Sequence, residues 1–225
     1  MDALEEMARF CFGYRQWDAP YWFIGLEEGM SGTMEKRVKA WQKLGRDTGL
    51  SDCREFHREI GVDDHHKEGA EIQKTWRVLM LILLAYKGVE HGKEHLRRYQ
   101  LTRLGWKEDE TVLTELFGLP AKNVKEGAAQ RKLHFSDAMI DEIHSQRIGT
   151  IRERLQQYSP SLVVMYGTSP KPKKEFARLA GRPMEGWDIF REGKSLITLI
   201  PHPTSHGRTN EQWIKHANGL REWRS

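Results

Sequence analysis

Four short runs of apolar residues constrain the fold of this chain more than any other feature. Each run is nearly continuous, and the four are residues 21–25, 112–117, 162–166 and 196–200. Continuous apolar runs of this length are typical of strands that are buried on both faces, and such strands usually pair in parallel. Residues 187–190 predict a further short strand, which turns at 192–194 and pairs with the last run as a hairpin.

Amphipathic segments with recognisable ends separate these runs. Thr33 and Ser136 each stand where a helix N-cap is expected, and Thr209 can form a capping box with Gln212. Residues 70–87 predict a long, largely buried helix. Strands that alternate with helices indicate the α/β class, and we expect a three-layer α/β/α sandwich with a central, mainly parallel four-stranded sheet.

The composition favours one soluble domain that spans residues 1–225. The chain is 38% hydrophobic and 30% charged, and its longest apolar run, 78–86, is far shorter than the roughly 20 residues that cross a bilayer. The acidic start of the sequence is unlike a secretory signal, so we expect a cytoplasmic, nucleoid-associated protein without a membrane partner. The formal net charge of +4 permits a nucleic-acid partner without requiring one.

Two cysteines, Cys11 and Cys53, lie far apart in the sequence. Neither has a partner at the usual metal-ligand spacing. Two cysteines also cannot form a disulfide framework or supply the four thiolates of an iron–sulfur cluster. We therefore expect two ordinary reduced thiols.

The loops that leave the carboxyl ends of the four apolar runs form the expected ligand site. In an open parallel sheet such loops converge on one edge. They comprise residues 25–29, 118–123, 167–170 and 201–208. Each contains Gly or Pro beside polar residues, which suits a backbone that approaches a ligand closely.

Two of these loops and one strand resemble motifs of the uracil-DNA glycosylase superfamily. Segment 22–29 (WFIGLEEG) is similar to its first motif, a Gly-rich turn with an acidic or amide residue that positions water. Segment 199–205 (LIPHPTS) resembles its second motif, a His-Pro-Ser-type loop, and segment 163–167 (VVMYG) its third strand. The resemblance spans residues 20–223. It implies a monomeric DNA repair enzyme that flips uracil out of the base stack and hydrolyses its N-glycosidic bond without a cofactor, leaving an abasic site.

The resemblance implies catalytic roles for Glu27, Glu28 and His202. The histidine of the second motif hydrogen-bonds a carbonyl oxygen of uracil, where negative charge develops as the base departs. A carboxylate of the first motif orients the attacking water and stabilises the cationic sugar. Glu27 aligns with that acid when the Gly-X-acid spacing is kept and is favoured, although Glu28 is adjacent.

Further residues of the same loops are expected to surround the substrate. The substrate-binding set comprises Gly25, Leu26, Gly29, Glu115, Phe117, Asn123, Gly167, Thr168 and Ser169. The DNA-binding set comprises Thr204, Ser205, His206, Arg208 and Lys171. Thr204 and Ser205 are expected to grip phosphates, and His206 or Arg208 to fill the gap left by the flipped base.

The sequence departs from the family pattern at the residue that reads the base. Better-known members carry Asn at the end of the second strand, whereas this chain has Thr114 and Glu115 there and Asn123 further along. Reading by Glu115 or by a backbone amide would extend the base range to hypoxanthine or xanthine. The chain therefore resembles a divergent branch without an iron–sulfur cluster, and no metal or cofactor is expected. The candidates for an aromatic platform under the base are Tyr21, Trp22, Trp41 and Phe117.

Competing interpretations of the same residues stay open. The chain could be a non-catalytic nucleic-acid or nucleotide-binding module with this fold. It could also be a metal-dependent hydrolase that uses Glu27, Glu28 and the histidine-rich loop near His65. Residues 25–29 could be an ordinary turn with solvated glutamates. For segment 63–66 (DDHH) we favour an exposed loop without metal, because adjacent histidine side chains diverge.

Overall fold

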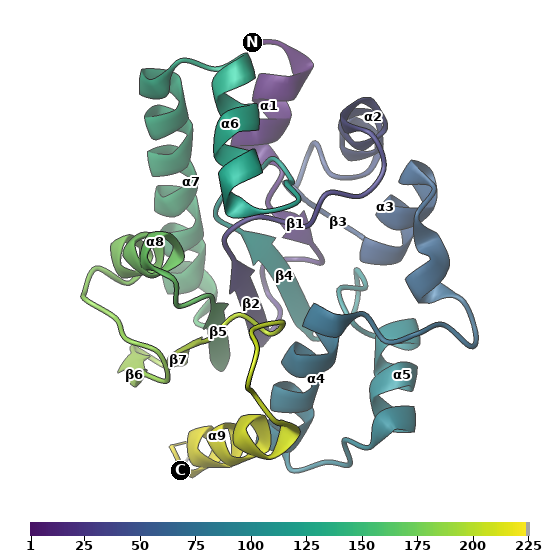
Figure 1. The fold of residues 1–225 in the computed structure, drawn as a ribbon, viewed down its shortest axis with the longest axis vertical. Coiled ribbons are helices and arrows are strands. Elements are labelled where there is room, and N and C mark those ends of the chain that lie inside the picture. Colours follow the sequence, from purple (N-terminus) through teal and green to yellow (C-terminus); the bar gives the residue numbers. More distant parts are fainter. Residues whose placement is uncertain (224–225) are drawn as a thin grey trace.

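The computed structural model describes residues 1–223, and its core is a seven-stranded mixed β-sheet (Figure 1). The strands are β1 (Gly13–Tyr14), β2 (Tyr21–Gly25), β3 (Leu50–Ser51), β4 (Thr111–Glu115), β5 (Leu162–Tyr166), β6 (Ile189–Glu192) and β7 (Ser195–Ile200). Their order across the sheet is β3-β1-β4-β2-β5-β7-β6. The predicted α/β class is confirmed.

The predicted four-stranded sheet is wrong in the number of its strands. The four apolar runs do form adjoining parallel strands, in the order β4, β2, β5 and β7. β6 pairs antiparallel with β7, so the predicted hairpin is confirmed, although it begins at Ile189 rather than Trp187. At the other edge, β1 pairs antiparallel with β4, and β3 pairs with β1. A two-residue strand is too short to carry a periodic pattern, so its pairing depends on tertiary packing.

Helices connect these strands. They are α1 (Ala3–Phe10), α2 (Met34–Leu44), α3 (Cys53–Ile60), α4 (Lys74–Lys87), α5 (Lys93–Thr102), α6 (Val124–His134), α7 (Asp137–Tyr158), α8 (Pro170–Ala180) and α9 (Asn210–Glu222), with a 3-10 turn η1 (Asp63–His66). The predicted N-caps Thr33, Ser136 and Thr209 are confirmed, since each accepts a hydrogen bond from a first-turn N–H. α4 begins later than predicted, because the side chain of Gln73 caps it by accepting from the N–H of Trp76.

Helices pack on both faces of the sheet. Alternate side chains of β2 point to opposite faces, as in any strand. Tyr21 and Phe23 join one apolar cluster, to which α4 and α9 contribute. Trp22 and Ile24 join a second cluster, to which α7 and α8 contribute. The parallel strands are therefore buried on both faces, which explains their continuous apolar runs.

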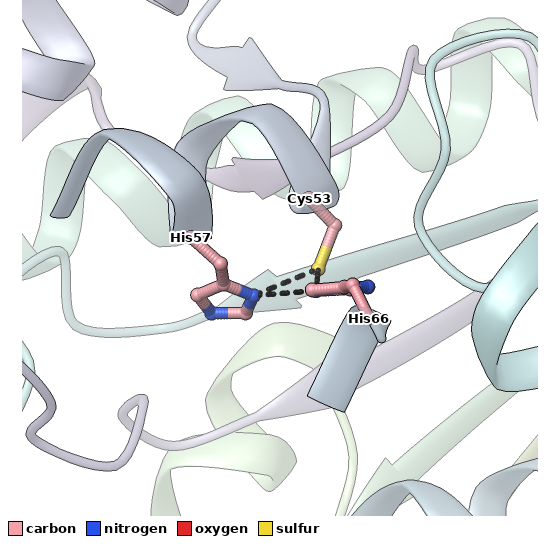
Figure 2. Close-up of side chains that lie close together, drawn as sticks. All are labelled: Cys53, His57 and His66. Carbon is pink, nitrogen blue, oxygen red and sulfur yellow. Dashed lines mark hydrogen bonds between the residues drawn. The ribbon is translucent and has the colours of Figure 1, made fainter. Parts of the chain in front are cut away.

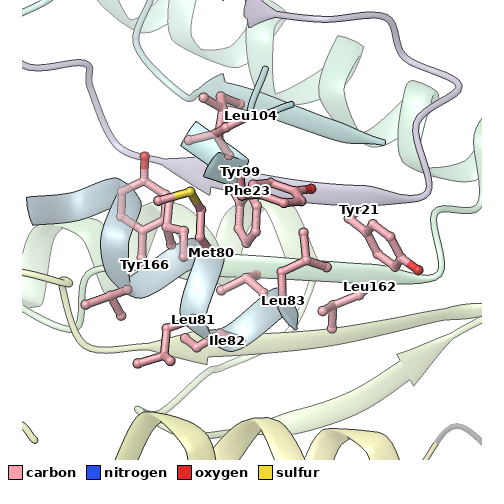
Figure 3. Close-up of a cluster of buried hydrophobic side chains, with 14 of the residues drawn as sticks. Tyr21, Phe23, Met80, Leu81, Ile82, Leu83, Tyr99, Leu104, Leu162 and Tyr166 are labelled. Atoms are coloured by element: carbon pink, nitrogen blue, oxygen red, sulfur yellow. The ribbon is translucent and has the colours of Figure 1, made fainter. Parts of the chain in front are cut away.

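α4 lies in the interior of the molecule. Residues 78–86 of this helix are all buried, and α9 packs against it. Figure 3 shows Met80 and Leu83 of α4 in one cluster with Phe23 of β2 and Leu162 of β5. Within residues 1–223, no helix has both the length and the apolar character that a membrane crossing requires.

Candidate functional site

A cavity of about 850 Å³ lies at the carboxyl ends of β2, β4, β5 and β7. All four predicted loops contribute to its wall, as the geometry of a parallel sheet favours. The predicted site residues that line it are Leu26, Glu27, Glu28, Gly29, Glu115, Asn123, Gly167, Thr168, Ser169, His202 and Ser205. The volume suits a nucleotide-sized ligand, because small-molecule sites hold about 300–1,000 Å³.

Other predicted site residues lie outside the cavity wall. They are Gly25, Phe117, Lys171, Thr204, His206 and Arg208. The ring of Phe117 is covered by His144, whose centroid is 4.2 Å away, and by the guanidinium of Arg131 at 3.9 Å. Arg208 belongs to an exposed loop, where its guanidinium lies 5.7 Å from the ring of Trp187.

The loop that carries Glu27 and Glu28 is fixed to the loop that follows β4. The N–H of Leu116 donates to the carbonyl of Gly25 at 3.0 Å, and the N–H of Ala121 donates to the carbonyl of Glu28 at 2.8 Å. These bonds extend the pairing of β2 with β4 beyond both strands. The side chains of Glu27 and Glu28 are 5% and 28% exposed. The interpretation of residues 25–29 as an ordinary turn with solvated glutamates is therefore wrong.

The carboxylate of Glu28 is held at the cavity wall by side chains from three elements. Tyr14 Oη donates to Oε1 at 2.7 Å, and the Arg37 guanidinium forms an ion pair with Oε2. His57 Nε2 lies 3.8 Å from Oε1. Burial alone would raise the pKa of Glu28, but these three partners outweigh it and lower the pKa to about 2. Glu28 is therefore a fixed anion beside the cavity.

Glu27 is engaged by a different element. Its carboxylate pairs with Arg131 of α6 at 2.7 Å, and both side chains are almost fully buried. Gly127 permits this close approach of α6, since a Cβ at that position would lie 2.4 Å from Glu27 Oε2. Both carboxylates line the cavity. The side chain of Glu28 is the more exposed, whereas Glu27 Oε1 is buried without a hydrogen-bond partner among residues 1–223.

Glu115 ends β4 and lines the same cavity. Tyr166 Oη donates to Glu115 Oε1 at 2.7 Å, and Oε2 is buried without a hydrogen-bond partner among residues 1–223. Burial raises the pKa of Glu115 to about 8, although the hydrogen bond from Tyr166 opposes this change. At neutral pH most Glu115 side chains are therefore protonated. Gly25 makes room for this pair, because a Cβ there would lie 2.1 Å from Glu115 Oε2 and 2.3 Å from Tyr166 Oη.

The buried Arg147 of α7 fixes the backbone at the end of β4. Its guanidinium donates to the carbonyls of Glu115 at 2.7 Å and Leu116 at 3.0 Å. It also donates to the carbonyls of Ala8 and Arg9, each at 3.3 Å. The position of Glu115 thus depends on Arg147. The apolar periodicity of the helix that begins at Ser136 does not indicate a role for this arginine.

His202 reaches the cavity from the loop after β7. The backbone N–H of Thr204 donates to His202 Nδ1 at 3.3 Å, and Thr204 Oγ1 lies 2.9 Å from the same nitrogen. Because Nδ1 accepts, the proton of the neutral ring lies on Nε2. Burial lowers the pKa of His202 and so favours this neutral form. The imidazole therefore offers one N–H donor, and the ring of Tyr166 packs against it at 5.9 Å between centroids.

The aromatic residues of the cavity differ from those expected. Tyr21, Trp22 and Trp41 are core residues and do not line it. Tyr14 and Trp76 do. Trp76 lies on the first turn of α4 and is half-buried, and it also packs against the apolar core.

A cluster of potential metal ligands lies beside the cavity. Cys53 and His57 of α3 and His66 of η1 place their ligand atoms within 4.8 Å of one another, and all three residues are buried. The interpretation of residues 63–66 as an exposed loop is therefore wrong for His66. The available signal was the spacing of Cys53 and His57, since residues four apart share one face of a helix.

No family model matches the chain, and no curated protein sequence matches it.

Proposed function

We propose that this protein is a DNA glycosylase that hydrolyses the N-glycosidic bond of uracil or of a related deaminated base. The observation that carries the proposal is that three complementary groups line one cavity: the Glu28 carboxylate, the His202 N–H donor and the protonated Glu115. They come from the loops after β2 and β7 and from the last residue of β4, which are distant in the sequence. The parallel strands with helices on both faces are consistent with a uracil-DNA glycosylase-like α/β/α sandwich.

In this mechanism Glu28 orients a water molecule toward the anomeric carbon of the flipped nucleotide. The glycosidic bond breaks with its electron pair on the base, and the carboxylate stabilises the positive charge that develops on the sugar. His202 Nε2–H donates to a carbonyl oxygen of the base, where negative charge accumulates. The water adds to the anomeric carbon and its proton passes through solvent to the base, so the products are free base and an abasic site.

Glu115 would read the edge of the base. Uracil, hypoxanthine and xanthine each present an amide edge, with an N–H beside a carbonyl oxygen. A protonated carboxyl offers one acceptor and one donor to such an edge. Tyr166 donates to Oε1, which favours the proton on Oε2. Because Oε2 is buried in this structure, the carboxyl would have to turn toward the base for this proton to be donated. Cytosine and adenine present the opposite order, so the pair of Glu115 and Tyr166 would discriminate against these two bases, whereas thymine and guanine present the same edge as uracil and hypoxanthine.

The remaining predicted residues would hold the DNA around the flipped nucleotide. Thr168, Ser169 and Ser205 line the cavity and are in position for phosphates close to it. Lys171, Thr204 and His206 lie outside its wall, where they would contact the DNA backbone, and Arg208 would fill the gap in the stack. The protein would act on chromosomal DNA in the cytoplasm as a monomer.

The test is release of base from labelled oligonucleotides. Each carries one uracil, hypoxanthine or xanthine, in single-stranded or duplex form, and the reactions contain EDTA. We expect an abasic product that breaks only after alkali treatment. Absence of this product with all three lesions would refute the proposal, and a salt-dependent complex without product would favour the non-catalytic binding module.

Two variants with matched controls assign the catalytic groups. Glu28→Gln is expected to lower turnover by about 10²–10⁴-fold, and His202→Ala by about 10²–10³-fold. The controls are Glu35→Gln and His95→Ala, which change exposed side chains on α2 and α5 and should retain wild-type turnover. Circular dichroism verifies that each variant is folded. Wild-type turnover in both cavity variants would exclude this mechanism.

A metal-dependent hydrolase is the second candidate, because His57 of the Cys53 cluster lines the cavity beside Glu28. The two candidates leave different products. A metal-dependent nuclease cuts the phosphodiester backbone without alkali treatment and is inactive in EDTA. The glycosylase instead leaves an abasic site that breaks only in alkali.

A further inference from the structure

A second cluster of reactive side chains adjoins the cavity, which one of its members, His57, lines. Cys53 begins α3, His57 lies one turn further along that helix, and His66 ends η1 (Figure 2). Their exposed fractions are 0%, 6% and 7%. None of the three has a role in the glycosylase mechanism above.

The donor atoms of this cluster lie near the spacing that a tetrahedral cation requires. Cys53 Sγ is 3.6 Å from His57 Nδ1 and 4.0 Å from His66 Nε2, and the two nitrogens are 2.9 Å apart. Zinc–sulfur and zinc–nitrogen bonds of about 2.3 and about 2.05 Å at tetrahedral angles place sulfur about 3.6 Å from nitrogen, and two nitrogens about 3.3 Å apart. Side-chain shifts that change the spacings by about 0.4 Å would complete the site.

The surroundings of His57 favour a lone pair that points into the cluster. Its Nε2 lies 3.8 Å from Glu28 Oε1, and a proton on Nε2 faces that carboxylate. The other nitrogen, Nδ1, is then unprotonated and directed at Cys53 and His66. A carboxylate on the far side of an imidazole is the usual partner of a metal-binding histidine, because it fixes the ring and strengthens the donor. Trp76 packs against the rings of His57 and His66, each at 5.7 Å between centroids.

We propose that Cys53, His57 and His66 bind a zinc-class divalent cation through Sγ, Nδ1 and Nε2. One thiolate and two imidazoles suit Zn²⁺, whereas Mg²⁺ and Ca²⁺ prefer oxygen donors. On binding, Cys53 releases its proton to solvent and donates an electron pair to the ion, and water takes the fourth position. The ion joins α3 to η1. This proposal replaces the sequence-based expectation that the chain binds no metal.

Cobalt titration of the full-length protein tests the site without DNA, so its outcome is independent of the glycosylase assay. The protein is reduced, stripped of metal with a chelator and titrated with Co²⁺. We expect saturation at a single equivalent, with a sulfur-to-cobalt charge-transfer band and the intense visible bands of tetrahedral cobalt. Zn²⁺ should then displace Co²⁺ and raise the Tm. A wild-type protein without the charge-transfer band would overturn the proposal.

Four variants locate the ligands. Cys53→Ser and His66→Ala should weaken Co²⁺ binding by more than about 100-fold, because even loss of an outer partner costs about 10–100-fold. Cys53→Ser should also lose the charge-transfer band. The matched controls are Cys11→Ser, at the other free cysteine, and His65→Ala, beside His66, and both should keep the wild-type spectrum.

Circular dichroism identifies the variants that are folded. If Cys53→Ser is not folded, His66→Ala decides the outcome through its affinity for Co²⁺. A charge-transfer band that survives in Cys53→Ser, or that disappears in Cys11→Ser, would contradict the assignment of the sulfur ligand. Wild-type affinity in His66→Ala would contradict the assignment of the nitrogen ligand.

Discussion

Replacement of Glu115 by Gln tests whether the cavity contains a neutral acid at physiological pH. Gln has the same shape and cannot ionise. In the folded protein, burial raises the pKa of Glu115 from 4.5 to about 8. The hydrogen bond from Tyr166 opposes this change, whereas the nearby carboxylates of Glu28 and Glu27 add to it. The variant therefore removes a group whose protonation differs between the folded and unfolded states.

The sign and size of the effect follow from that difference in pKa. Unfolded chains lose the proton near pH 4.5, whereas folded chains keep it until about pH 8. Between these values the unfolded state binds fewer protons, so the wild-type protein loses about 1.4 kcal/mol of stability per pH unit as the pH rises. The full interval corresponds to about 5 kcal/mol. The stabilising contribution of the protonated Glu115 is fully present below pH 4.5 and is completely lost above about pH 8.

Urea unfolding of the wild-type protein and Glu115→Gln at pH values from about 5 to about 9 measures this loss. The free energy of unfolding of the variant, minus that of the wild type, should rise by about 1.4 kcal/mol per pH unit and level off near pH 8. Glu35→Gln is the matched control. Its ion pair with Lys39 lowers the pKa of Glu35, so this carboxyl is charged in the folded and unfolded states throughout this pH range. The difference in free energy of unfolding between Glu35→Gln and the wild type should therefore not change with pH.

A pH-independent difference for Glu115→Gln would refute the reasoning, because it would mean that Glu115 is already ionised in the folded protein. The same residue predicts a pH dependence of activity. Wild-type turnover on uracil should fall as the pH rises through about 8, since Glu115 then loses the proton that it donates to the base. A turnover that stays level through that pH would remove Glu115 from base reading.

Three further substitutions test other contacts. Gly25→Ala places a methyl group 2.1 Å from Glu115 Oε2. Turnover should therefore fall, and the free energy of unfolding should decrease by about 1–3 kcal/mol. Wild-type turnover would show that the cavity adapts freely. Arg37→Met leaves Glu28 without its buried counter-charge and should lower the free energy of unfolding by about 3–5 kcal/mol in urea, whereas no change would mean that the pair adds nothing. Arg208→Ala should reduce turnover on duplex more than on single-stranded DNA, because only the duplex has a stacked gap to fill; equal losses would leave Arg208 as a phosphate contact.

The central strands and several helix starts were predictable because the interactions that specify them are local. Residues 21–25 and 162–166 form strands with the predicted bounds, since burial on both faces requires a continuous apolar run. Thr33 and Ser136 cap helices through bonds to N–H groups three residues away. The position of the cavity was also predictable, because parallel strands direct their exit loops to one edge.

Only the tertiary structure decided which partner each side chain in that cavity has. Glu27 and Glu28 are adjacent and identical in type, and their surroundings differ because Glu27 pairs with Arg131 of α6 and Glu28 with Arg37 of α2. Cys53 likewise has no partner at metal-ligand spacing in the sequence, but packing of η1 against α3 places His66 beside it in the structure. A local pattern specifies which way a side chain faces, but its partner across the structure is specified by packing between segments distant in sequence, and the pKa and the ligands of a buried group depend on that partner.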